Sequence, residues 1–169
     1  MNEIYHLEKP VDVLKWDAAQ VEAHLIEAMW TMTRLPDPSA SWQHVKAGWG
    51  EVIHDYAHND AEAVARKSLP TKEQHERWEG ILNWVRDYIT LPEDRTLIGC
   101  ACLSRMGAVR FWVDKATGRE PSTKFNWEVI KVIIAQETSG YERRSVRVLR
   151  RHYRKGLEII AAKLNAKDM

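Results

Sequence analysis

Apolar side chains recur every three to four residues along most of the chain, and this spacing constrains the fold more than any other feature. The most regular example follows Thr71 and Gln74, which have the spacing of a capping box. Its apolar residues are Trp78, Ile81, Leu82, Val85 and Ile89. They share one face of a helix of 3.6 residues per turn. The sequence therefore predicts an amphipathic helix from about residue 72 to 89.

The same signals appear in other segments. Asp17 and Gln20 have the spacing of another capping box, and helical spacing continues from there to Met32. The segment 90–93 opens a further helix, and Ser41 can cap one that reaches Tyr56. No internal repeat is visible, and the segment 107–125 receives no assignment. We predict an all-α fold.

Charge is divided unevenly along the chain, although the net charge is only +1. Residues 1–120 contain 14 basic and 19 acidic side chains, a net charge of −5, whereas residues 121–169 contain 11 and 5, a net charge of +6. We predict an acidic helical bundle over 1–120 and a basic region over 121–169. A basic segment of this kind indicates an anionic partner, with nucleic acid as the first candidate.

The basic region has the outline of a helix-turn-helix. A helical pattern from Trp127 to Glu137 is followed by Gly140, and a long second pattern runs from Glu142 to Asn165. Its apolar stripe comprises Val146, Leu149, Tyr153, Leu157, Ile160 and Leu164. The predicted core of the motif is Trp127, Ala135, Gly140, Val146 and Leu149. The fold expected for the whole chain is an acidic bundle plus a helix-turn-helix with a long final helix.

Seven cations occupy the thirteen positions 143–155 of the predicted second helix. In a helix-turn-helix, the early turns of this helix enter the major groove of DNA. The residues predicted to read bases are Glu142, Arg143, Arg144, Arg147 and Arg151, and those predicted to contact phosphates are Arg150, Arg154 and Lys155. Val148 also falls on the outward side. The alternative is a solvated arginine-rich helix whose cations hold the acidic half of the same chain.

At these residues the chain resembles a family of uncharacterised proteins from bacteriophages and prophages. The resemblance is carried by three segments: residues 16–49, with Trp16-Asp17-Ala18-Ala19-Gln20-Val21-Glu22; residues 84–95, with Leu91-Pro92-Glu93-Asp94-Arg95; and residues 127–165, with Arg143-Arg144-Ser145-Val146. The last segment is also similar to the promoter-reading helix-turn-helix of sigma factors. The stretch 107–125 departs from the family as an insertion, and the spacing from Ala135 to Gly140 is one residue too long. The resemblance implies DNA binding but no established activity.

Other candidate sites are weaker. His54 and His58 have a spacing that can bind zinc, but no third ligand is evident. Cys100 and Cys102 lie in an apolar setting that favours small core residues. The tryptophans are expected mainly in the core, because Trp30, Trp49, Trp78 and Trp84 fall on or near apolar stripes, while Trp42 is a candidate for exposure at a partner surface. We therefore expect neither a metal nor another cofactor.

These features predict a sequence-specific double-stranded DNA-binding protein, a transcriptional regulator of phage or prophage type, rather than an enzyme. The start of the chain lacks the pattern of a signal peptide, and no run is apolar enough to span a membrane, so we expect a cytoplasmic protein. Leu157, Ile160 and Leu164 extend past the DNA-facing turns and suggest a homodimer; the alternative is that they are buried within the chain itself. RNA polymerase is a further candidate partner. Two alternatives remain open: a DNA-packaging subunit similar to a small terminase, and a protein-interaction module that uses the cationic helix.

Overall fold

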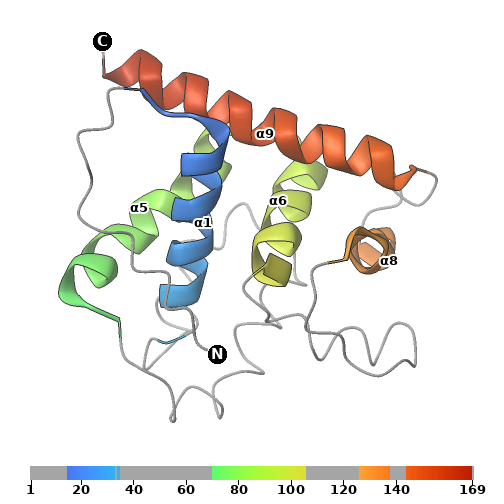
Figure 1. Cartoon of the computed structure of the whole chain (residues 1–169), viewed down its shortest axis with the longest axis horizontal. Coiled ribbons are helices and arrows are strands. Elements are labelled where there is room, and N and C mark those ends of the chain that lie inside the picture. The colour runs from blue at the N-terminus through green and yellow to red at the C-terminus, as the bar shows by residue number, and fades with distance from the viewer. Residues whose placement is uncertain (1–14, 33, 35–69, 106–125, 138–143, 169) are drawn as a thin grey trace.

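The computed structural model describes residues 15–32, 34, 70–105, 126–137 and 144–168 (Figure 1). Within these ranges all regular structure is α-helical. The helices are α1 (Ala18–Met32), α5 (Lys72–Tyr88), α6 (Pro92–Arg105), α8 (Trp127–Glu137) and α9 (Val146–Lys167). The prediction of an all-α fold is confirmed.

Local capping signals set the starts of the first two of these helices. At α5, Thr71 accepts a hydrogen bond from the backbone N–H of Gln74, and the Gln74 side chain accepts one from the Thr71 N–H. Asp17 and Gln20 make the same reciprocal pair before α1, at 2.8 and 3.0 Å. Each box satisfies backbone donors that the first helical turn leaves unpaired. Both predicted capping boxes are therefore confirmed.

The long helix α9 crosses the other helices of the bundle. Figure 1 shows α9 lying along one edge of the molecule, with α1, α5 and α6 running away from it, and α8 seen end-on below its first turns. Helix α9 packs against all four of these helices, and α8 also packs against α6. The described helices thus meet along one side of α9.

One hydrophobic cluster unites the acidic and the basic parts of the chain. Its most deeply buried members include Leu25 and Met29 of α1, Leu82 of α5, and Leu149 and Ile160 of α9. The tryptophans predicted for the core behave accordingly where they are described: Trp30, Trp78 and Trp127 are buried, and Trp84 is half-buried against the cluster. The basic helix is therefore held to the acidic bundle by apolar packing.

The start of the last helix corrects one expectation. We predicted a helix beginning at Glu142, but α9 begins at Val146, and Arg144 and Ser145 precede it. The Ser145 hydroxyl accepts a hydrogen bond from the Val148 N–H, and serine in extended backbone is a favoured N-cap. The helix predicted over 41–56, the segment 107–125 and the 120/121 boundary lie outside the described residues.

Candidate nucleic-acid interface

Helix α9 has two faces of different chemistry. Its buried residues are Leu149, Tyr153, Gly156, Leu157, Ile160, Ala161 and Leu164. This set confirms the predicted apolar stripe, with Val146 partly buried at its start. The opposite face is exposed to solvent and carries most of the cations of the helix. The sequence pattern alone had predicted this division of the helix into an apolar and a cationic face.

The exposed cations form two parallel rows. Arg147, Arg151 and Lys155 are spaced four residues apart and form the first row, and Arg150 and Arg154 form the second with the same spacing. All five side chains are exposed. From Arg147 to Lys155 the helix rises by about 12 Å, close to the width of the major groove of B-DNA. The five cations thus span about two turns of the helix.

None of the five cations makes an ion pair with any residue that the structure describes. The ion pairs observed there join Lys72 to Glu76, Arg77 to Glu27, Arg86 to Asp87 and Arg105 to Glu22. The alternative that the arginines of α9 hold the acidic half of the chain finds no support among these pairs. Apolar residues hold the two parts together instead.

The cations also oppose the dipole of their own helix. Arg147 lies in the first turn of α9, and this turn contains no acidic residue. The positive end of a helix dipole disfavours cations there by up to about 1 kcal/mol each at an exposed site. This arrangement costs stability in the free protein, and an anion bound nearby would offset the cost.

Polar contacts fix the position of α9 on the bundle. The Tyr153 hydroxyl donates a hydrogen bond of 2.6 Å to the Glu22 carboxylate of α1. The His152 Nδ1 lies 3.2 Å from the Asp94 carboxylate of α6, and its Nε2 lies 3.2 Å from an Arg144 guanidinium nitrogen. If Arg144 donates to Nε2, then Nδ1 carries the proton that binds Asp94. Asp94 and His152 thus anchor Arg144 next to the start of α9.

The remaining predicted site residues are placed as follows. Glu142, Arg143 and Gly140 lie outside the described residues, so the predicted turn is not described. Arg144 is half-buried against His152 and precedes the helix, apart from the exposed rows. Trp127 and Leu149 are core residues as predicted, whereas Ala135 and Val146 are partly buried. The structure thus brings together Arg147, Arg150, Arg151, Arg154 and Lys155.

The residues that suggested a dimer do not form an external surface. Leu157, Ile160 and Leu164 are all buried within the chain itself, at 4%, 0% and 8% exposure. They pack in the same cluster as the acidic bundle. The inference of a homodimer from these three residues is therefore wrong, because their apolar surface is already covered.

Sequence reasoning missed the polar roles of Tyr153 and His152. The spacing correctly placed Tyr153 on the apolar stripe, but its hydroxyl reaches Glu22, which lies 131 positions away in the sequence. His152 contacts Asp94, 58 positions away. A buried tyrosine usually finds a partner for its hydroxyl, so the place of Tyr153 on the apolar stripe is the one signal that could have indicated a polar partner. Its identity depends on how the helices cross.

The cysteines and histidines are the weaker candidate sites that the sequence offers. Cys100 and Cys102 are buried in the core, as predicted. Among the described residues, no group of three or more His, Cys, Asp or Glu side chains is arranged to hold a metal ion. His54, His58 and Trp42 lie outside these residues. No described helix is long and apolar enough to cross a bilayer.

Comparison of the chain with protein-family models, with curated proteins and with solved structures finds no match. The resemblance to phage proteins and to sigma factors stays a prediction. The geometry of α9 is therefore the basis for a functional assignment.

Proposed function

We propose that this chain is a double-stranded DNA-binding protein that presents the exposed face of α9 to the major groove. One observation carries the proposal: five exposed cations lie in two rows on this face, and none pairs with an anion in the described part of the chain. Cations at such a density repel one another, and phosphate groups would relieve the repulsion. A binding role, rather than catalysis, is the function that this surface fits.

The order of the helices also supports DNA binding of the helix-turn-helix type. Helix α8 packs against the buried side of α9, where Trp127 contacts Tyr153 edge-to-face at 5.4 Å. The exposed side of the first turns of α9 is left to meet a partner. Arg147 and Arg151 are the candidates to read base edges, and Arg150, Arg154 and Lys155 are the candidates to contact phosphates.

Transcriptional control in a phage or prophage setting, in the cytoplasm of a bacterial host, is the role that we favour. A second chain and RNA polymerase are candidate partners in that role. A packaging function would use the same DNA-binding face but in a ring, so the mass of the assembly in solution separates the two roles. A dimer or monomer agrees with regulation, and a ring of many copies overturns it.

A titration of labelled duplex DNA by fluorescence anisotropy tests the DNA-binding proposal. The variant Arg154→Gln/Lys155→Gln removes two candidate phosphate contacts and should weaken binding, and the slope of log affinity against log salt should fall by about 0.9 for each phosphate that the variant no longer neutralises. The matched control is Lys163→Gln, which removes an exposed cation from the same helix outside the two rows. An unchanged affinity and salt slope in the double variant would refute the proposal.

Two further measurements complete the test. Glu158→Gln removes the anion that continues the second row, four residues after Arg154, and should strengthen binding, because a carboxylate there repels phosphate. All four substituted side chains are exposed, so the free energy of unfolding of each variant should lie within about 0.5 kcal/mol of that of the parent protein. Selection of a preferred duplex from a random pool tests sequence specificity. Equal competition by every duplex would exclude base reading.

A further inference from the structure

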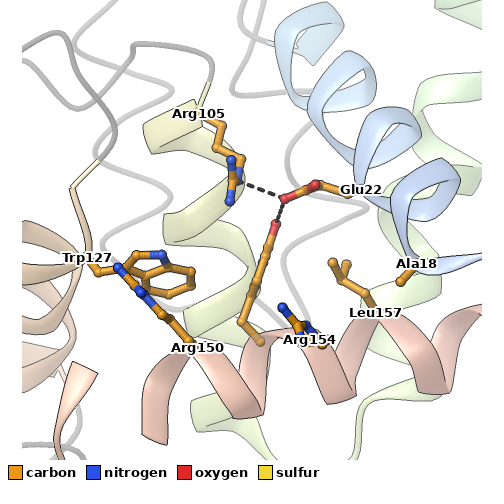
Figure 2. A pocket seen from close by; sticks show the side chains of 8 residues that line it. Ala18, Glu22, Arg105, Trp127, Arg150, Arg154 and Leu157 are labelled. Atoms are coloured by element: carbon orange, nitrogen blue, oxygen red, sulfur yellow. Dashed lines mark hydrogen bonds and ion pairs between the residues drawn. The ribbon is translucent and has the colours of Figure 1, made fainter. Parts of the chain in front are cut away.

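A pocket of about 330 Å³ lies between α9 and the helices that it crosses. Its lining comes from α1, α6, α8 and α9 and comprises Ala18, Glu22, Arg105, Trp127, Arg150, Tyr153, Arg154 and Leu157 (Figure 2). Small-molecule sites in proteins begin at about this size, and they combine apolar walls with a few polar groups that converge. This pocket has that composition.

The charge of the pocket favours an anion. Glu22 is already engaged, because its carboxylate accepts from Tyr153 at 2.6 Å and pairs with Arg105 at 2.8 Å (Figure 2). Arg150 and Arg154 add two positive charges that no described carboxylate neutralises. The guanidinium groups of two arginines, one turn apart, can bind the oxygens of a single carboxylate.

The phenol of Tyr153 does not add negative charge to this site. Burial, together with the nearby Cys102 and Glu22, raises the pKa of Tyr153 far above its ordinary value of 10.0. The hydroxyl therefore keeps its proton and donates a hydrogen bond to Glu22. The paired Glu22 and the protonated phenol leave the pocket with a net positive charge.

The walls of the pocket favour a flat apolar body. Trp127 and Tyr153 pack edge-to-face, with ring centroids 5.4 Å apart, and Leu157 contributes an aliphatic wall. The Arg150 guanidinium lies 6.0 Å from the Trp127 ring centroid, at the limit of a cation–π contact. The ring of a flat ligand can pack edge-to-face against Trp127 or Tyr153.

We propose that this pocket binds a small aromatic carboxylate, and that the ligand competes with DNA for Arg150 and Arg154. The competition rests on the proposed function, whereas the binding does not. Its structural basis is that the same two arginines also line a second hollow on the exposed face of α9, together with Arg147, Arg151 and Lys155. A guanidinium that turns toward a carboxylate in the pocket is withdrawn from phosphate. Ligand and DNA then weaken each other by an equal factor.

Calorimetric titration of the full-length chain, without DNA, tests the pocket. The probes are benzoate and indole-3-acetate, with benzamide as the control for shape alone and inorganic phosphate as the control for charge alone. Both carboxylates should bind, whereas benzamide and phosphate should bind at least about tenfold more weakly, a difference of about 1.4 kcal/mol. Failure of both carboxylates to bind at millimolar concentration would overturn the proposal. Equal binding of phosphate would show that the site recognises any anion, which also overturns it.

Matched variants on α9 locate the binding. Arg150→Gln and Arg154→Gln should each weaken benzoate binding about tenfold, the loss typical of a charge-assisted hydrogen bond. Arg151→Gln removes the same charge from the same helix but lines only the outer hollow, so benzoate binding should not change. An equal loss in all three variants would indicate a general charge effect and reject the pocket.

The competition is measured separately with labelled duplex. Benzoate should lower the DNA affinity of the parent protein and should have no effect in Arg150→Gln/Arg154→Gln. If the parent binds no DNA, the proposed function fails while the calorimetric result on the pocket stands. If DNA binds and benzoate binds without any change in DNA affinity, the proposed competition is wrong.

Discussion

Asn165, near the end of α9, pairs its side-chain amide with both backbone polar groups of Trp16, just before α1. Its Oδ1 accepts from the Trp16 N–H at 2.7 Å, and its Nδ2 donates to the Trp16 carbonyl at 2.9 Å. The two residues are 149 positions apart. One side chain thus fixes the start of the first described helix to the end of the last.

Asn165→Asp should destabilise the fold by about 2 kcal/mol, because a carboxylate oxygen would then face the Trp16 carbonyl without a donor. The added negative charge also lies at the unfavourable end of the α9 dipole. The matched control is Asn126→Asp, since the bond that Asn126 makes within the described residues uses its oxygen, which accepts from the Glu128 N–H at the start of α8. That control should be neutral or slightly stabilising. Urea unfolding measures both, and equal losses would contradict the assigned role.

Gly156 permits the close crossing of α9 over α6. A Cβ at this position would lie 2.8 Å from the Ile98 Cδ1. Gly156→Ala should therefore cost about 1 kcal/mol, since overpacking outweighs the gain in helix propensity. At Gly80 no described atom outside the neighbouring helix backbone lies within 4 Å of the added Cβ, so Gly80→Ala should stabilise α5 by about 1 kcal/mol.

Ile98→Val, which removes the contacting methyl group, provides a further check of the Gly156 contact. In this background Gly156→Ala should lose its cost and become stabilising. Thermal unfolding of the four proteins of this cycle gives the coupling between the two sites. Independent effects of the two substitutions would show that the crossing does not depend on this contact.

Glu27 is a buried carboxylate between α1 and α5, with a side chain only 2% exposed. It accepts from the Gln74 amide at 3.0 Å and pairs with Arg77. Arg77→Met should destabilise the fold by about 3 kcal/mol, because it leaves the buried charge without a cation. Lys72→Met breaks the exposed pair with Glu76 and should cost no more than about 0.5 kcal/mol.

Substitution of both partners decides whether the Arg77 effect is electrostatic. Glu27→Gln/Arg77→Met removes both charges and should recover part of the stability that Arg77→Met loses. A double variant that is less stable than the single variant would attribute the loss to packing of the arginine stem instead. Urea unfolding at neutral pH provides the comparison.

Stability should fall above about pH 9, because two buried groups resist ionisation in the folded state. Burial raises the pKa of Cys102 to about 12 from an ordinary value of 9.0, and it raises the pKa of Tyr153 still further. As the pH rises, the unfolded chain releases these protons before the folded chain does. The stability that each group contributes is therefore fully present below its unfolded pKa and declines above it. Each group contributes a slope of about 1.4 kcal/mol per pH unit above its unfolded value.

Cys102→Ala isolates one of these two contributions. Between about pH 8 and pH 10.5, the parent protein should lose about 2 kcal/mol more than the variant does. Urea unfolding at the two pH values gives the loss in the free energy of unfolding of each protein. The contributions of all other titrating groups cancel when the two losses are subtracted. Equal losses in both proteins would show that the Cys102 thiol is not shielded from solvent.

Features that depend on a few neighbouring residues were predictable from the sequence. The capping boxes at Asp17 and Thr71 and the apolar stripe of α9 need only local hydrogen bonds and helical spacing, so they were predicted correctly. The start of α9 was not, although Ser145 is itself a favoured N-cap. Arg143 and Arg144 continue the helical spacing equally well, so the spacing alone does not locate this start.

Contacts between distant parts of the chain could not be predicted. The pair of Tyr153 with Glu22 and the close approach of Gly156 to Ile98 depend on the angles at which α9 crosses the other helices. Spacing along one helix shows which face is buried but not which residue covers it. For the same reason, the sequence could not show whether Leu157, Ile160 and Leu164 face a second chain or the core of their own chain. In the structure they are core residues.

The division of α9 into a buried and an exposed face has a consequence for how this protein can diverge. The residues that pack the helix against the bundle and the exposed cations that we propose bind DNA are different side chains on the same turns. Arg147, Arg151 and Lys155 can therefore change in relatives without loss of core packing. A lineage that inherits this scaffold can acquire a new binding preference through surface substitutions alone, while the fold is preserved.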